Sequence, residues 1–295
     1  MLNAVILVRI PSLRLISEGA QAKLGRVSAS PLMVIKAGEP WRIRSHDGIA
    51  AVAPAGKKGQ NMEPSSIKKY VAEAIGTFAL TLCGCGAAAI AGETLGSLGI
   101  AMCFGLTVVA MAFAIGDVSG CHINPAITLA AFIDGRMSAK DMVCYWVAQI
   151  IGGLLGGLVL AGIIMCTELP VALTGLGCNG YGVLSATGLS MAGAIIVEVI
   201  LTFLFVMTVL GSTANEKTAP YAGIIIGLTL ALLVAVGLPL TGTSVNPARS
   251  FGPAVFMSVF GGDATALSQV WVFFVGPLAG GALAAVVHGA LVKSK

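Results

Sequence analysis

Six apolar runs of about 20 residues each lie between Tyr70 and Val292, uninterrupted or nearly so. A helix of that length spans the hydrocarbon core of a bilayer. Hydrophobic residues make up 57% of the chain and charged residues 10%, an apolar excess that a soluble domain of this size does not need. The sequence therefore predicts an all-α membrane protein with six transmembrane helices. We place them near residues 70–91, 98–116, 141–166, 189–210, 219–238 and 268–291.

A three-residue unit, Asn-Pro-Ala, occurs twice between these runs. Asn is a favoured helix N-cap, and Pro suits the first helical position because its missing N–H needs no partner there. Each unit therefore predicts the start of a short half-helix, whose positive end would lie at membrane depth. The residues are Asn124, Pro125 and Ala126 in the first unit and Asn246, Pro247 and Ala248 in the second.

The two units belong to a longer internal repeat. The pattern Glu-x-x-x-Thr-Phe begins at Glu73 in the first span and again at Glu198 in the fourth. Each half of the chain, about 67–166 and 189–292, holds three spans and one half-helix. Three is odd, so the halves enter the membrane from opposite sides as an inverted repeat of re-entrant half-helices. Irregular backbone at that depth either lines a water-filled path or is buried as a purely structural loop.

Charge sets the expected orientation. After the first 56 residues, Lys and Arg flank one side of the six spans, except for Arg249 in the second repeated stretch. The opposite side carries Glu93, Glu168 and Asp263. By the positive-inside rule both termini are expected in the cytoplasm, in an inner or plasma membrane. The formal net charge of +4 then needs no nucleic-acid partner.

Residues 1–61 share none of this pattern. They mix short apolar runs, scattered Arg and Gly/Pro punctuation, which suggests a disordered N-terminal extension. An organellar transit peptide fits better than a secretory signal, although acidic residues count against it. Alternatively, Met62 is the natural start, because the chain leads directly from there into the first span. Residues 62–295 form the predicted channel domain.

Taken together, the two Asn-Pro-Ala units, the Glu-x-x-x-Thr-Phe repeat and the stretch from Ser244 to Arg249 resemble the aquaporin (major intrinsic protein) family. The resemblance covers Ile67 to about Val292 and is nearest in appearance to prokaryotic water channels. It implies one pore per chain, a homotetramer and no cofactor. It also assigns a selectivity filter to Phe104, Val234, Thr243 and Arg249.

This filter departs from both common patterns of the family. Strict water channels usually carry His at the position of Val234. Glycerol facilitators usually have Trp, Gly and Phe at the positions of Phe104, Val234 and Thr243. Arg249 is also the costliest side chain in the membrane region, which marks a functional residue, although an Arg that reaches back to the interface is the alternative.

The chemistry expected of the remaining candidates is hydrogen bonding. The side-chain oxygens of Asn124 and Asn246 would cap the half-helices, leaving both amide NH2 groups free to face the lumen as donors. Glu73 and Glu198 are interpreted as supports that accept hydrogen bonds from the half-helix loops, with proton-relay carboxylates as the alternative. His122 is interpreted as loop bracing or pore edge rather than a metal ligand. Asp117 adds charge to one mouth or is simply solvated.

These patterns predict a passive water channel that excludes ions and protons, with no enzymatic activity, no cofactor and no metal. Its partners would be water and the lipid bilayer. A channel for small neutral solutes such as glycerol or ammonia is the alternative. An ion-coupled secondary transporter is a weaker one, because it needs an unpaired carboxylate facing the lumen.

Overall fold

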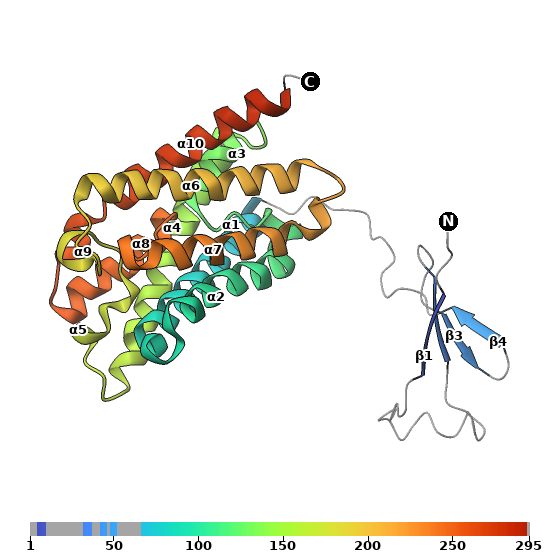
Figure 1. The fold of residues 1–295 in the computed structure, drawn as a ribbon, viewed down its shortest axis with the longest axis horizontal. Coiled ribbons are helices and arrows are strands. Elements are labelled where there is room, and N and C mark those ends of the chain that lie inside the picture. Colours follow the sequence, from blue (N-terminus) through green and yellow to red (C-terminus); the bar gives the residue numbers. More distant parts are fainter. Residues whose placement is uncertain (1–4, 10–31, 37–41, 46–47, 52–65, 294–295) are drawn as a thin grey trace. The chain divides into compact units, whose positions relative to one another are not determined.

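A computed structural model of this protein describes residues 5–9, 32–36, 42–45, 48–51 and 66–293. The chain divides into two units, Met1–Glu63 and Pro64–Lys295. The described part of the second unit consists of helices and their connecting loops (Figure 1). Five helical stretches in it are long and apolar enough to cross a membrane.

The described residues of the first unit are four short strands, β1 (Val5–Arg9), β2 (Leu32–Lys36), β3 (Arg42–Ser45) and β4 (Gly48–Ala51). They form one antiparallel sheet in chain order. The expectation of a disordered N-terminal extension stays a prediction. The alternative start at Met62 stays a prediction, because that residue lies outside those described.

The first of the five stretches, Ser66–Ser119, holds two of the six predicted spans. It comprises α1 (Ser66–Leu80), a π-helical turn at Thr81–Cys85 and α2 (Gly86–Ser119). Its 54 residues would measure roughly 80 Å as one straight helix, well over twice the hydrocarbon core. Gly96 breaks it with φ 62° and ψ 178°. Gly76 then lies against Ile115 and Gly84 against Phe104, so the second span runs back along the first. The six predicted spans are confirmed.

The other helices follow the predicted order. The two half-helices are α3 (Pro125–Ile133) and α8 (Pro247–Phe256). The remaining spans are α4 (Ala139–Met165), α6 (Met191–Ala214), α7 (Ala222–Thr241) and α10 (Val272–Lys293), and the short helices α5 (Val171–Thr174) and α9 (Thr265–Gln269) lie in connections. Short turns of tighter or wider helix occur at Gly175–Gly177, Gly182–Leu184, Ala219–Tyr221 and Met257–Gly261.

The two halves exchange their half-helices. Within the first half α1 packs on α4, and within the second half α6 packs on α10. The half-helix α3, however, packs on α10 of the second half, and α8 packs on α4 of the first. Where the halves meet again, α2 packs on α7. The inverted repeat is therefore visible in the packing as well as in the sequence.

Glycines allow these helices to touch backbone to backbone. A Cβ at Gly153 of α4 would overlap the carbonyl oxygen of Ala248 in α8. In the other half, a Cβ at Gly281 of α10 would lie 2.7 Å from the carbonyl oxygen of Ala126 in α3. Small residues at helix crossings permit such close approach in membranes, where van der Waals packing drives association.

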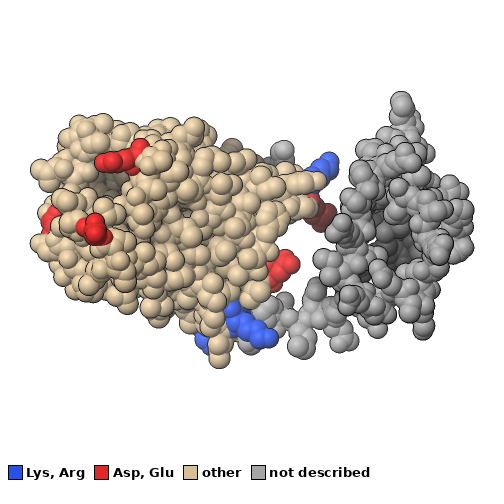
Figure 2. Space-filling view, turned by 90° about the horizontal axis from the view of Figure 1, so that it is seen from below, with Lys and Arg blue, Asp and Glu red and all other residues tan. Residues whose placement is uncertain are grey.

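Charged side chains lie at the ends of the helical unit. In the view of Figure 2, Lys and Arg appear at one end only, whereas Asp and Glu appear at both ends. The broad surface between the ends carries neither in this view. Exposed large apolar residues of the helical unit include Leu106, Phe113 and Leu232, as expected of helices that face lipid.

We expect Gly153→Ala to destabilise the protein, because the added methyl group must push α8 away from α4. The cost should be about 1–3 kcal/mol or more, the usual penalty of an overpacked core. Thermal unfolding in detergent measures it. Gly162→Ala in the same helix is the matched control, because nothing lies within 4 Å of its added Cβ. Equal melting temperatures for the two variants would contradict the backbone contact.

Candidate functional site

Both half-helices begin at the proline of an Asn-Pro-Ala unit, with the preceding asparagine as N-cap. Asn124 Oδ1 accepts the backbone N–H of Ala126 at 2.8 Å. Asn246 Oδ1 accepts the N–H groups of Ala248 at 3.1 Å and Arg249 at 3.3 Å. Each helix N-terminus carries the equivalent of roughly half a positive charge.

The amide groups of the two asparagines join the half-helices to each other. Asn124 Nδ2 donates to the carbonyl oxygen of Val245 at 2.7 Å. Asn246 Nδ2 donates to the carbonyl oxygen of Ile123 at 2.9 Å. The sequence predicted that both NH2 groups are free, but one N–H of each amide is used across the repeat. A second N–H remains on each, and both asparagines line a shared cavity.

The loops before the half-helices have an unusual backbone. In the first, Cys121 and Ile123 have φ values of 51° and 45°. In the second, Thr243 and Val245 occupy the matching positions with 48° and 44°. Left-handed conformations are genuinely unfavourable for β-branched residues and cost about 1–3 kcal/mol each. Such loops persist only where their surroundings hold them.

Glu73 of α1 holds the first loop. Its Oε1 accepts the Ser119 hydroxyl at 2.7 Å and the His122 backbone N–H at 2.9 Å. Its Oε2 accepts the Ile123 N–H and the Gln149 side-chain amide. The side chain is fully buried. A carboxylate suits this position because it accepts several bonds and needs no donor in return.

Glu198 of α6 holds the second loop with matching hydroxyl and backbone N–H contacts. Its Oε1 accepts the Thr241 hydroxyl at 2.7 Å and the Ser244 N–H at 2.9 Å, and its Oε2 accepts the Val245 N–H at 2.8 Å. Thr241 in turn accepts the Thr243 N–H, as Ser119 accepts that of Cys121. Both carboxylates are thus occupied by loop donors, which is the arrangement of a support.

One cavity, about 200 Å³ in volume, is lined by both loops and by all four residues of the expected filter. Phe104, Val234, Thr243 and Arg249 are buried and border it. The Arg249 guanidinium carbon lies 4.9 Å from the centre of the Phe104 ring. The same cavity reaches past both Asn-Pro-Ala units to residues of α6 and α7.

Arg249 is held by carbonyl oxygens rather than by a carboxylate. Its Nη1 donates to the carbonyl of Gly177 at 2.8 Å and to Asn179 Oδ1 at 2.7 Å. Its Nη2 lies 3.4 Å from the carbonyl of Gly242. These neutral acceptors orient the guanidinium and leave its positive charge uncompensated by them. Asn179 was missed by the sequence analysis because it lies in a connection outside the repeat.

His122 borders the cavity and braces the first loop. Its Nδ1 lies 3.1 Å from the Thr128 hydroxyl, and its ring stands edge-on to Tyr145 with 5.3 Å between ring centres. Asp117 is exposed, and the cavity lining does not include it. Ser119 and Thr241 are further supports that the sequence analysis did not name, although their spacing of 122 residues matches that of the two Asn-Pro-Ala units.

Comparison with known proteins points to the same kind of site. The profile of the Major intrinsic protein family matches residues 60–288. The chain belongs to this family. Aquaporin Z of Brucella melitensis biotype 1 is 43% identical over 230 residues, covering 77% of this chain and 98% of the relative. Aquaporin Z of Rhodopseudomonas palustris is 41% identical over 227 residues, covering 76% of this chain and 92% of the relative.

Among solved structures, the chain resembles the aquaglyceroporin from Plasmodium falciparum with a TM-score of 0.67. The two share 20% sequence identity, over 78% of this chain and 98% of the other. At that identity the likeness concerns the fold, which is the six-span arrangement with two half-helices described above.

We expect Glu198→Gln to destabilise the second loop. A Gln side chain offers one acceptor oxygen and turns an NH2 donor toward the remaining loop donors, leaving buried N–H groups unpaired. The free energy of unfolding, measured by thermal unfolding, should fall by about 2–4 kcal/mol. The exposed Glu168→Gln removes the same charge and should stay within about 0.5 kcal/mol of the parent. Comparable losses in both variants would count against the loop-support role.

Proposed function

We propose that this protein is a passive water channel that excludes ions and protons, with one pore in each chain. The single observation that carries the proposal is the meeting of two Asn-capped helix N-termini in one cavity with a buried Arg249 that is held by neutral acceptors. Two relatives that are named Aquaporin Z support the proposal. No chemical step is needed, because flow follows the osmotic gradient.

The pore chemistry follows from the donors that face the cavity. Asn124 and Asn246 each offer an N–H that binds a water molecule by its oxygen. A water held in this way turns its hydrogens away from both helix ends, which interrupts a chain of water molecules that could relay protons. Arg249 and the positive half-helix ends oppose cations. Aquaporins are the known example of selectivity from an Arg and half-helix dipoles, so this part is general to such pores.

An ion-coupled transporter is disfavoured by the occupation of both buried carboxylates. Glu73 and Glu198 each accept bonds from two loop N–H groups and from one hydroxyl at the end of the preceding helix. A coupling ion or a moving proton would have to displace these donors and release a strained loop. The alternative with an observation in its favour is weak passage of small neutral solutes. Val234 stands where strict water channels usually carry His, which is bulkier and polar.

The proposal includes several features of assembly. Both termini face the cytoplasm, which the positions of Lys and Arg at one end support (Figure 2). Four copies form a homotetramer, as the family resemblance implies. Residues 62–295 carry the channel, the pore has no cofactor or metal, and the protein has no enzymatic activity.

The proposal is tested by paired water and glycerol flux in reconstituted vesicles of the parent and Val234→His. We expect rapid water flow with weak but measurable glycerol passage in the parent. Val offers neither the hydrogen bond nor the bulk of His, and the lost bond costs only about 1 kcal/mol because a neighbouring water replaces it. Val234→His should abolish glycerol passage and change water flow much less. Absence of osmotic water flow in the parent vesicles would overturn the proposed water channel itself.

Mercurial inhibition is a second check on the pore. All seven cysteines lie in the described residues, and among them Cys121 alone lines the cavity. We expect that any block of water flow by a mercurial occurs at this thiol and disappears in Cys121→Ser. Cys83→Ser, which removes an exposed thiol outside the cavity lining, should remain as sensitive as the parent. A block that persists in Cys121→Ser would place the reactive thiol elsewhere.

A further inference from the structure

A second guanidinium group borders the same cavity, at the end away from Arg249. Arg136 lies in the loop just after α3 and lines the cavity together with Leu210 and Thr213. We call this end of the conduit the inner mouth, defined by these three residues. The half-helix α3 starts at Asn124 and is nine residues long, so its far end lies about 14 Å from the Asn-Pro-Ala units.

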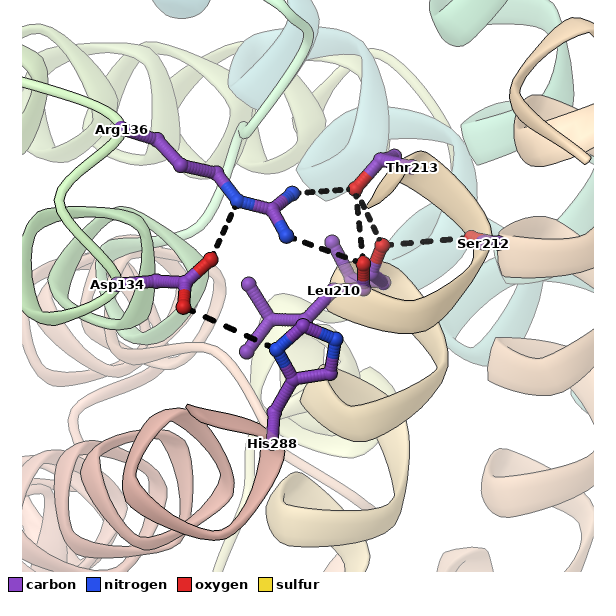
Figure 3. Close-up of polar contacts among 7 residues, drawn as sticks. Asp134, Arg136, Leu210, Ser212, Thr213 and His288 are labelled. Atoms are coloured by element: carbon purple, nitrogen blue, oxygen red, sulfur yellow. Dashed lines mark hydrogen bonds and ion pairs between the residues drawn. The ribbon is translucent and has the colours of Figure 1, made fainter. Parts of the chain in front are cut away.

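Three hydrogen bonds fix the Arg136 side chain at the inner mouth (Figure 3). Its Nε donates to Asp134 Oδ2 at 2.6 Å, and its Nη1 donates to the Thr213 hydroxyl at 2.6 Å. Its Nη2 donates to the carbonyl oxygen of Leu210 at 3.1 Å. The planar fork therefore bridges the end of α3 to the last turn of α6, and 31% of the side chain is exposed. An Arg held at three points has little freedom to leave the conduit wall.

Asp134 is braced from behind by the last span. It is the C-cap of α3, and its side chain is only 7% exposed. His288 of α10 places its Nδ1 3.8 Å from Asp134 Oδ1 (Figure 3). The carboxylate that receives Arg136 is thus confined between α3 and α10, which fixes the direction in which the guanidinium is held.

Without Arg136 the inner mouth would be an electronegative entrance. The C-terminal ends of α3 and α6 meet there, and each carries a partial negative charge. Asp134 adds a carboxylate at the end of α3. A concave entrance lined by one sign of charge concentrates the opposite ion. Arg136 places a positive charge on the wall and uses a C-terminal carbonyl of α6, which offsets this attraction.

We propose that Arg136 is a specificity-determining residue, a second cation barrier at the inner mouth that acts independently of Arg249. Asp134 and Thr213 are positioning residues that hold the guanidinium at the wall. This inference rests on the proposed water-channel function. The conduit then presents a guanidinium group at each end, with the two helix N-termini between them.

The test is made in vesicles reconstituted with the full chain at one pH. In the parent, Arg249 and the helix ends already limit cation entry and mask a second barrier. Potassium flux and osmotic water flow are therefore measured in Arg249→Val and in Arg249→Val with Arg136→Gln. We expect the double variant to pass potassium roughly three- to sixfold faster than the single variant, as for loss of one charge near the ion path.

Two matched variants separate charge from structure. Arg136→Lys in the Arg249→Val background keeps the charge and should restore the lower potassium flux. Lys140→Gln in that background removes one positive charge from an exposed site outside the cavity lining and should leave the flux unchanged. If Arg136→Gln does not fold, Thr213→Glu carries the test, because it cancels the charge beside an intact Arg136 and should raise the flux similarly.

Equal potassium fluxes in Arg249→Val and the Arg136→Gln double variant would overturn the proposal. So would an equal rise in Lys140→Gln, which would mean a general effect of net charge, or an equal rise in Arg136→Lys, which would mean a structural role. Failure of the proposed function is distinct, because it appears as absent water flow in parent vesicles.

Discussion

The structure depends on satisfying the backbone of two irregular loops at membrane depth, and two buried carboxylates meet that requirement. Hydrocarbon offers no hydrogen bonds, so each loop N–H must find a protein acceptor. Glu73 and Glu198 supply acceptors to loops whose β-branched residues adopt left-handed conformations. A charged side chain that would be costly alone is stabilised by several donors converging on it. The buried carboxylates and the left-handed loops therefore stabilise each other.

The same carboxylates determine where the helix ends point. Because each loop is held from the side by its own half, the two asparagines face each other and bond across the repeat. Each of these bonds uses one N–H of the side-chain amide and leaves the second N–H at the cavity. Backbone contacts at Gly153 and Gly281 then press the half-helices against the spans of the opposite half. Position and polarity in the pore thus follow from contacts outside it.

Sequence reasoning captured what depends on local rules or on the repeat. Apolar run length predicted six spans, and the Asn-Pro pairs predicted both helix starts, because caps and span lengths need no tertiary information. The inverted repeat placed Glu73 and Glu198 near their loops. It did not predict the cross-bonded amides, since an N-cap rule says nothing of a partner 121 residues away. Asn179, Arg136 and Asp134 were equally out of reach, because their contacts with Arg249, α6 and α10 join residues that are far apart in the chain.

The exchange of half-helices has a consequence for biosynthesis. The first half-helix, α3, rests on α10, which is the last span of the described chain to be made. During synthesis the first three spans can insert while α3 still lacks the surface that its glycine contact requires. The packing of α3 is therefore complete only after the final span arrives. One half made alone would lack its partner surface, and two such halves in opposite orientations would supply it to each other, as a primitive antiparallel dimer would.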